Sequence, residues 1–459
     1  MPTDTPPHLR RDLGLLQITM IGIGAMIGAG IFVLIGAAAG QAGPAVILAF
    51  ALNGVIAVIV GAHYAELSAA MPRAGGPYFW LKQSFGPGWG FLAGWLSWFA
   101  NICACALYAL AFGSFAADLA RVTLGVSTAD AARLATPLAV GITGLFLWVN
   151  VRGVRNAGWA ETALTGLKIA ILLVFVAFGL GAVFGRASFP DAYTPFLPDR
   201  AASLFGAMGL IFIAFEGYEI ITRSAEEVRQ PEQTIPRAIF LSIAVSVTLY
   251  IAIAFVLFGG VVAPPGERVS TYLGSLGELG MAEAAGQLMP YGRVALLVAG
   301  LASTASALNA TVFAASRISF AMGRGGELPR LLGRIHARHL TPHWATGVTG
   351  VLVVTMVLAL PVYEVGASAS LMFLLVFVLV CASVAWLRRT QPDLPRPFRV
   401  PGVPYLSWIG VGSGVGLAVA LLDLTPVAWA TALCWLALGL VIYRLPTAPP
   451  PGGHTAERS

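Results

Sequence analysis

Apolar residues run in long stretches along this chain, and short polar segments separate the stretches. A helix needs about 20 mostly apolar residues to cross the hydrocarbon core of a bilayer. The pattern therefore predicts an all-α membrane protein with twelve transmembrane helices. We expect these helices at 13–36, 44–70, 86–117, 134–151, 160–184, 203–222, 236–262, 284–316, 343–361, 367–387, 404–423 and 426–443.

The first apolar stretch contains three glycines, Gly24, Gly28 and Gly30. Each glycine inside a helix costs about 1 kcal/mol relative to alanine. The glycines suggest one of two arrangements. Either a neighbouring helix packs closely on the small residues, or the helix breaks and its free amides hold a ligand. Taken alone, this stretch favours packing.

The sixth apolar stretch has the second unusual sequence, since Glu216, Gly217 and Glu219 fall in its middle. It opens the second set of five expected helices, as the glycine-rich stretch opens the first. Interruptions at corresponding positions of two halves are typical of inverted-repeat transporters, in which they form the binding site. This correspondence favours ligand binding at both places.

A charged residue also lies within the fifth stretch, about a third of the way along it. Lys168 would cost several kcal/mol in hydrocarbon unless its ammonium faces a cavity or a partner. It lies some two turns from the nearer end, so it either extends to the membrane surface or occupies a functional cavity. We favour the cavity.

Other polar residues admit a structural and a functional interpretation. In the third stretch, Asn101 and Cys105 share one helix face, and Asn101 either bonds a neighbouring helix or lines a pocket. In the eighth stretch, the hydroxyls of Ser303 and Ser306 either bond their own helix or bind a cation or proton. Glu66, at the edge of the second stretch, is expected to pair with an arginine of a neighbouring loop.

Composition and charge agree with a membrane protein, since 58% of residues are hydrophobic and 10% are charged. With the N-terminus placed in the cytoplasm, 20 of the 27 Lys and Arg residues fall on the cytoplasmic side and 6 on the other, with Lys168 left in a span. This asymmetry follows the positive-inside rule, so we expect both termini in the cytoplasm. The net charge of +6 then requires no nucleic-acid partner.

The expected organisation is therefore two five-helix units between short tails. The segments are a cytoplasmic tail at 1–12, a first unit at 13–184, a second unit at 201–387, two further helices at 404–443 and a disordered cytoplasmic tail at 444–459. The four cysteines lack metal or redox spacing, and we expect them to be buried small hydrophobic residues.

Motifs of other functional classes do not occur in the sequence. There is no HExxH and no GxSxG, and neither Lys82 nor Lys168 is followed by the Ser or Thr of a Walker A motif. We therefore expect neither an enzyme nor an ATP-driven pump, with no cofactor, no metal and no obligate protein partner. A channel remains as a third class.

Six pieces of the chain together resemble the amino acid–polyamine–organocation (APC) superfamily of amino acid permeases. They are Gly24–Phe32, Tyr64–Tyr78, Phe212–Glu219, Glu226–Arg237, Asn309–Pro329 with His336 and Pro342, and Arg396–Pro401. The resemblance extends over nearly the whole chain. It implies a LeuT-like fold of five plus five inverted helices with helices 1 and 6 broken, followed here by two C-terminal helices in the cell membrane.

The resemblance also implies where an amino acid would bind. Its carboxylate would meet the amides of Gly28, Ala29 and Gly30, at the positive end of a half-helix. Its amino group would meet carbonyls at the two breaks, and its side chain a pocket between helices. The implied residues at the breaks are Met26, Ile213, Ala214, Glu216 and Gly217, and those of the pocket are Cys105 and Thr311.

Some relatives carry a lysine at the position of Lys168 where sodium-driven relatives place sodium. The resemblance thus favours proton-coupled symport, with Lys168 as the coupling residue and Ser303 or Ser306 as its partners. Amino acid exchange without proton coupling is the alternative. Glu216 departs from the apolar residue of many relatives and leaves the substrate open.

Overall fold

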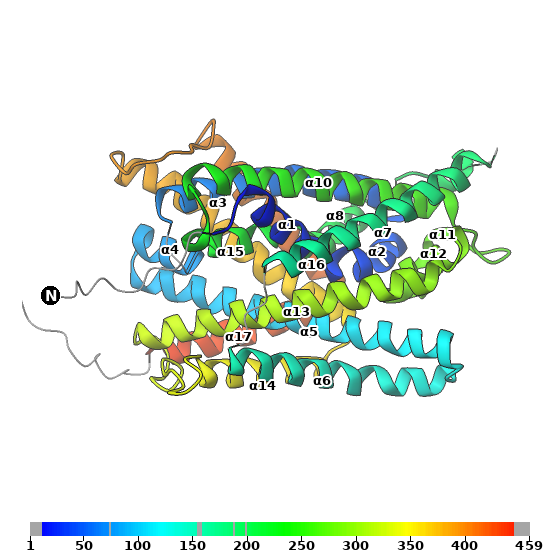
Figure 1. Ribbon diagram of the computed structural model, residues 1–459. Helices are drawn as coiled ribbons and strands as arrows, with labels where there is room; N and C mark the ends of the chain where they lie inside the picture. The colour runs from blue at the N-terminus through cyan, green and yellow to red at the C-terminus, as the bar shows by residue number, and fades with distance from the viewer. Residues whose placement is uncertain (1–11, 73–74, 154–157, 187–188, 198–199, 445–459) are drawn as a thin grey trace, which may run out of the picture.

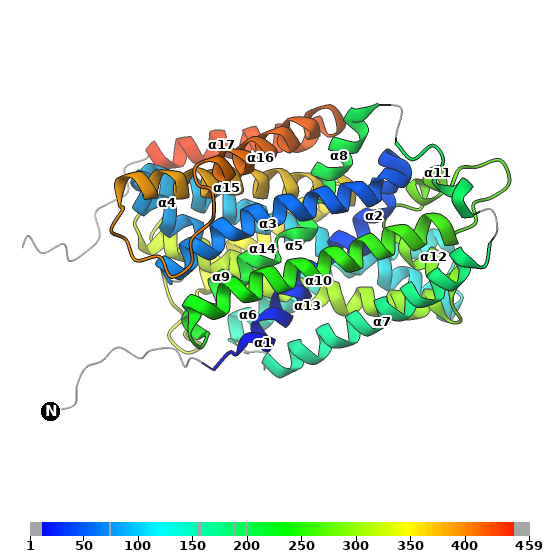
Figure 2. The same cartoon turned by 90° about the horizontal axis from the view of Figure 1, so that it is seen from above.

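The computed structural model describes residues 12–72, 75–153, 158–186, 189–197 and 200–444 as a bundle of long helices (Figures 1 and 2). The described ends of the chain lie at the same end of the bundle as α4, and α11 and α12 lie at the other end. We call these the α4 end and the α12 end. The expected tails, 1–12 and 444–459, fall almost wholly outside the described residues.

Regular structure in the described residues is helical, apart from one bridge between Leu13 and Val228. The first part comprises α1 (Leu15–Met26), α2 (Ala29–Ala42), η1 (Gly43–Ala45), α3 (Val46–Ala70), α4 (Pro77–Phe85), α5 (Pro87–Leu124), α6 (Thr128–Arg152), α7 (Gly158–Phe184) and η2 (Phe189–Tyr193). The second part comprises α8 (Ala201–Ile211), η3 (Phe212–Phe215), α9 (Gly217–Arg223), η4 (Ala225–Glu227), α10 (Pro231–Gly260), α11 (Val269–Ser275), η5 (Gly277–Leu279), α12 (Gly280–Leu288), α13 (Gly292–Arg324), α14 (His343–Ala359), α15 (Val362–Thr390), α16 (Tyr405–Leu424) and α17 (Pro426–Arg444).

Ten segments of the described chain are long and apolar enough to cross a membrane. One of them, Leu15–Ala70, contains α1, α2 and α3 and covers two of the expected spans. The expected span at 343–361 corresponds to α14, which has 17 residues and is shorter than the other candidates. The chain is thus an all-helical, multi-pass membrane protein.

The expected span at 284–316 is wrong at its start. Its first residues belong to α12, which ends at Leu288, and a new helix begins at Gly292. Pro290 separates the two, because proline disfavours a helical conformation in the residue before it. Tyr291 follows with a φ of 54°, which stops one helix from running into the next.

Both expected interruptions are present in the backbone. α1 ends at Met26 and α2 begins at Ala29, so Ile27 and Gly28 are not helical. In the second interruption, the 3₁₀ turn η3 and Glu216 separate α8 from α9. Each long helix is therefore divided into two halves inside the bundle.

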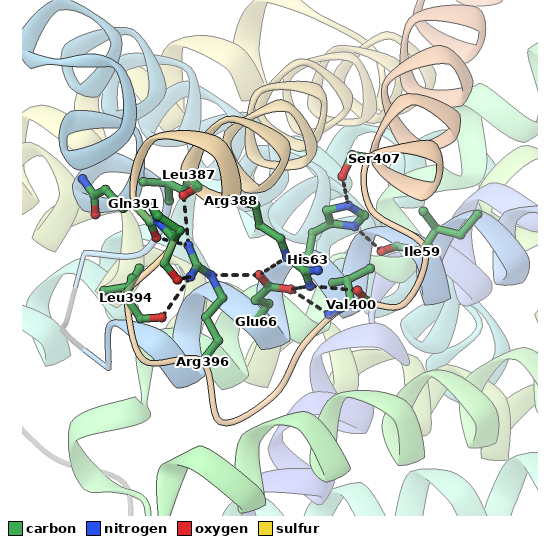
Figure 3. Close-up of polar contacts among 11 residues, drawn as sticks. Ile59, His63, Glu66, Leu387, Arg388, Gln391, Leu394, Arg396, Val400 and Ser407 are labelled. Carbon is green, nitrogen blue, oxygen red and sulfur yellow. Dashed lines mark hydrogen bonds and ion pairs between the residues drawn. The ribbon is translucent and has the colours of Figure 1, made fainter.

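A cluster at the α4 end fixes the loop between α15 and α16, residues 391–404, onto α3 (Figure 3). Glu66 of α3 is 1% exposed and makes two hydrogen bonds with Arg388, at 3.0 and 2.6 Å. It also accepts a bond from the backbone N–H of Val400 at 2.7 Å and forms an ion pair with Arg396 at 3.3 Å. The pairing expected for Glu66 is thus present, with two arginines.

His63, about one turn before Glu66, adds a second link to the same region. One ring nitrogen lies 2.7 Å from the carbonyl of Ile59 and the other 2.8 Å from the hydroxyl of Ser407 in α16 (Figure 3). Because a carbonyl only accepts, Nδ1 carries a proton, and in the neutral ring Nε2 accepts from Ser407. Two neighbouring residues of α3 therefore hold the loop and the helix that follows it.

We expect Glu66→Ala to destabilise the protein strongly. The substitution removes the carboxylate that pairs with two guanidinium groups and accepts one backbone N–H, and breaking a buried ion pair costs about 3–5 kcal/mol. Unfolding of the purified protein in detergent measures the loss. The control is Arg133→Ala, which removes an exposed pair with Asp130 of 3.8 Å and should change stability by less than about 1 kcal/mol. Equal stability of the two variants would contradict this role for Glu66.

Candidate functional site

The two helix interruptions lie side by side and share one hydrogen-bond donor. Tyr250 of α10 is buried, and its hydroxyl lies 2.5 Å from the carbonyl oxygen of Met26 and 3.1 Å from that of Ala214. The first carbonyl belongs to the break between α1 and α2, and the second to η3. One side chain therefore holds both breaks in the interior of the bundle.

The halves of the two broken helices also approach each other at glycines. A Cβ atom on Gly30 would lie 2.4 Å from the Cβ and 2.5 Å from the Cα of Ala214. A Cβ atom on Gly217 would lie 2.5 Å from the carbonyl oxygen of Gly22. Both interpretations of the glycines therefore describe part of the structure, because the helix breaks and the broken halves also pack on each other.

The backbone groups expected to hold an amino acid are placed together but already have some partners. The carbonyls of Met26 and Ala214 accept from Tyr250, that of Ile213 accepts from the Glu216 N–H, and that of Glu216 accepts from the Glu219 N–H. Since a carbonyl oxygen can accept two bonds, each retains capacity for a further donor.

The start of α2 offers the matching donors. Gly28 is its N-cap and no side chain caps this terminus. The first N–H groups of a helix have no partner within the helix, and the helix dipole makes the same terminus favourable for an anion. The amides at Gly28, Ala29 and Gly30 thus form a terminus suited to a carboxylate.

Glu216 belongs to the second break, and its side chain contacts α5. Its side chain is 4% exposed, and the hydroxyl of Tyr108 donates to its Oε1 at 2.7 Å. Its Oε2 is buried and has no hydrogen-bond partner among the described residues. A buried oxygen without a donor is costly, so this side chain can accept a bond from a ligand.

A cavity of about 280 Å³ lies beside the last turn of α1, just before the first break. Its lining includes Gly24 and Ala25 of α1, Tyr108 of α5, and Ser306 and Thr311 of α13. Five lining residues, Ile220, Ser224, Glu227, Ala310 and Phe313, also line a second cavity of about 570 Å³ nearer the α4 end. The cavity beside α1 therefore adjoins a second one that extends toward the α4 end.

The structure brings some of the expected pocket residues to this cavity and not others. Thr311 and Ser306 line it, whereas Cys105 is fully buried in α5 and lies about one turn from Tyr108. Three of the four cysteines are buried, but Cys434 is exposed on α17, so its expected burial is wrong. In the described residues, no group of three or more His, Cys, Asp or Glu could hold a metal ion.

The residues expected to couple transport lie on two neighbouring helices, where Lys168 and Ser303 are buried and Ser306 lines the cavity. Lys168 of α7 is 1% exposed, and its Nζ has no hydrogen-bond partner among the described residues. Ser303 of α13 donates to the carbonyl of Ile27, and Ser306 donates to Glu161, whose two oxygens lie 2.7 and 2.8 Å away. Both serine oxygens can still accept a bond.

Asn101 has the interhelical role that was one of its two interpretations. Its amide nitrogen donates to the Ser97 carbonyl at 2.6 Å, and its oxygen accepts from Arg223 of α9 at 3.3 Å. Arg223 also pairs with the buried Glu219. These contacts fix the half-helix α9 against α5.

Sequence reasoning missed Tyr250, Tyr108 and Glu161 as members of this region. Tyr250 lies in a continuous apolar stretch in which an aromatic residue carries no special signal. Glu161 did carry a signal, because it lies seven residues before Lys168, a spacing that places both on one helix face.

Interrupted helices whose free backbone groups meet inside an apolar bundle are typical of membrane transporters. The comparison with known proteins agrees. Residues 13–455 match the family described as amino acid permease, and the chain belongs to this family.

Three relatives illustrate the range of the family. The branched-chain amino acid permease BcaP of Bacillus subtilis is 28% identical over 96% of this chain and 94% of its own length. The methylthioribose transporter of the same organism is 29% identical over 95% and 93% of the two chains. BcaP of Lactococcus lactis is 29% identical over 96% and 95%. These relatives match the chain over nearly their whole length, and their names refer to two kinds of substrate, branched-chain amino acids and methylthioribose.

We expect Gly30→Ala to lower both stability and transport, because the new methyl group would overlap Ala214 at 2.4 Å. α2 and η3 would have to move apart, which lowers the free energy of unfolding by about 1–3 kcal/mol. Thermal unfolding and uptake into proteoliposomes measure the two effects. The matched control is Gly181→Ala on α7, where nothing lies within 4 Å. It should keep transport and gain up to about 1 kcal/mol. Wild-type behaviour of Gly30→Ala would show that the close contact is unnecessary.

Proposed function

We propose that this chain carries out secondary active transport of amino acids across the cell membrane by proton symport. The observation that supports this most is the pair of breaks joined by Tyr250, which gathers backbone acceptors and an uncapped helix start in one place. The proposed fold is LeuT-like, with twelve spans in two inverted five-helix repeats, 13–184 and 201–387, and two further helices.

In this proposal the substrate lies between the breaks. The amides at Gly28, Ala29 and Gly30 bind its carboxylate, and carbonyls at the breaks bind its ammonium group. Gly217 keeps the halves close together. The substrate side chain extends toward α5 and α13. The acceptor and pocket residues proposed are Met26, Ile213, Ala214, Glu216, Cys105 and Thr311.

The end of the bundle toward which the cavities extend indicates which side of the membrane they face. The α4 end carries the described chain ends and most of the Lys and Arg residues, and positive loops favour the cytoplasm. We therefore place both termini and the open cavity on the cytoplasmic side, so that this conformation is the one that exchanges substrate with the cytoplasm.

Proton coupling is assigned to Lys168, with Ser303 and Ser306 as neighbours. A proton can drive transport if two conformations of the protein bind it with different affinity. The surroundings of a buried amine without a partner change when the helices move, and its proton affinity then changes too. The alternative is an exchanger in which Lys168 is a constant structural cation.

We expect Lys168→Ala to abolish uptake driven by a pH gradient. The substrate for the assay is the amino acid that most raises the melting temperature, since a ligand of the folded state stabilises it by mass action. In proteoliposomes that are acidic outside, the wild type should accumulate this substrate and Lys168→Ala should not. Sodium should have no effect. Uptake that ignores the gradient but responds to amino acid inside the vesicles would identify an exchanger.

Lys82→Ala is the matched control, because Lys82 is the other lysine of the chain. Burial lowers the pKa of Lys82, but hydrogen bonds from its ammonium to Glu327 at 2.7 Å and Tyr78 at 3.3 Å outweigh burial and raise the pKa overall. Its ammonium therefore stays charged around neutral pH. Gradient-driven uptake should persist in this variant.

Glu216 is proposed to set the preference among substrates, because its buried Oε2 lacks a donor. A polar or cationic substrate side chain would supply one, and a hydrogen bond to a charged group contributes about 1.5–3 kcal/mol. Glu216→Gln should therefore reduce uptake of serine and lysine about tenfold relative to leucine. Competition among the three amino acids measures the profile. An unchanged profile would remove Glu216 from selectivity.

A further inference from the structure

Three polar residues of α7 form a row along one face of the helix. Glu161, Thr165 and Lys168 are spaced by four and three residues, which places them one above another. The row faces α1 at Gly24, where a Cβ atom would lie 2.4 Å from the Thr165 Oγ1 and 3.2 Å from the Glu161 Oε1. It faces α13 at Ser306.

The inner two members of the row are buried without partners. Thr165 is 0% exposed and Lys168 is 1% exposed, and neither the Thr165 Oγ1 nor the Lys168 Nζ has a hydrogen-bond partner among the described residues. Unsatisfied polar atoms at two consecutive turns cost several kcal/mol of burial energy. Packing alone does not explain why the face is polar, because apolar side chains would fill it at less cost.

The outer member of the row reaches the cavity. Glu161 lies in the first turn of α7, lines the 280 Å³ cavity and is partly exposed. Helical side chains lean toward the N-terminus of their helix, so a lysine at 168 extends toward Thr165 and Glu161. Glu161 also interacts electrostatically with Lys168. The row thus begins at an open cavity and ends at a sealed lysine.

We propose that Glu161 carries the proton between Lys168 and the cavity, with Thr165 as the intermediate hydroxyl. The transfer requires the side chains of Lys168, Thr165 and Glu161 to move into hydrogen-bond contact. An N–H bond of the Lys168 ammonium then breaks as the Thr165 oxygen accepts that proton, and the Thr165 hydroxyl proton passes to the Glu161 carboxylate. Glu161 then releases the proton to water in the cavity. No electrons are exchanged, and each proton lost by one group is gained by the next. The relay rests on the proton symport proposed above.

Among the described residues, the helices packed against α7 place no other charged side chain beside the row of Glu161, Thr165 and Lys168. These helices are α1, α10, α12 and α13. α1 contains no charged residue, and Glu232 and Arg237 of α10 are exposed. The remaining described charges on these helices are Glu283 of α12, which pairs with Arg293 of α13, and Arg317 and Arg324, which follow Ser306 on α13 by 11 and 18 residues. Glu227 of η4 lines the same cavity but is not on the row.

The test compares two transport modes in proteoliposomes. Net uptake driven by an acid exterior requires a proton to pass through the protein, whereas exchange of labelled for unlabelled substrate requires none. Glu161→Gln keeps the size of the side chain and its bond with Ser306 but cannot accept a proton. We expect it to lower gradient-driven accumulation at least tenfold, to lower substrate-linked acidification of a dye inside the vesicles equally, and to leave exchange within twofold of the wild type.

Two further variants complete the design. Glu232→Gln removes a carboxylate from the first turn of another helix, outside the cavity, and both modes should be unchanged. Glu161→Asp keeps a carboxylate and should restore most of the driven uptake.

Each contrary result separates the relay from the function on which it rests. If Lys168→Ala loses driven uptake and Glu161→Gln keeps it, the relay is wrong and proton symport stands. If Glu161→Gln and Glu161→Asp both lose exchange together with driven uptake, Glu161 is structural and the relay is wrong. If the wild type ignores the pH gradient, proton symport and the relay are both wrong.

Discussion

The backbone hydrogen bonds missing at two broken helices are the constraint on which this structure depends. In hydrocarbon, each unpaired N–H or C=O group costs several kcal/mol, so breaks are possible only where side chains replace the lost partners. Tyr250 does so for Met26 and Ala214, and Ser303 does so for Ile27. Ser370 of α15 donates to the Leu210 carbonyl at 2.8 Å and accepts from the Ile213 N–H at 3.1 Å. Hydroxyls from α10, α13 and α15 therefore replace backbone hydrogen bonds that the two breaks remove.

A second set of polar contacts lies at the end of the bundle, where water can compete for hydrogen bonds. Glu66 binds two arginines and a backbone N–H while it is almost completely buried. Its partners come from the end of α15 and from the loop that follows. The helix that supplies Ser370 to the second break is thus fixed at its other end to α3, which ties the position of this serine to a charged cluster far along the same helix.

Local signals in the sequence identified the breaks, but the long-range contacts could not be predicted from it. Glycines in an apolar stretch and a carboxylate at 216 are unusual for a membrane helix, and they marked the two segments that break. Tyr250, Ser370 and Tyr108 are ordinary residues of their helices, and their roles arise from the rotation of each helix about its axis. That rotation is set by packing against several neighbours at once, which apolar periodicity does not encode. The same limit explains the expected span at 284–316, where continuous hydrophobicity hid the turn at Pro290 and Tyr291.

The bridge made by Tyr250 has a consequence for hydrogen bonding at the centre of the bundle. A phenol has one hydroxyl proton, but two carbonyl oxygens lie within its reach. The two oxygens share a single proton, so the centre of the protein has more acceptors than this hydroxyl can fully satisfy. An ammonium group has three N–H donors. A group with several donors would therefore complete hydrogen bonding that the fold leaves incomplete at the centre of the bundle.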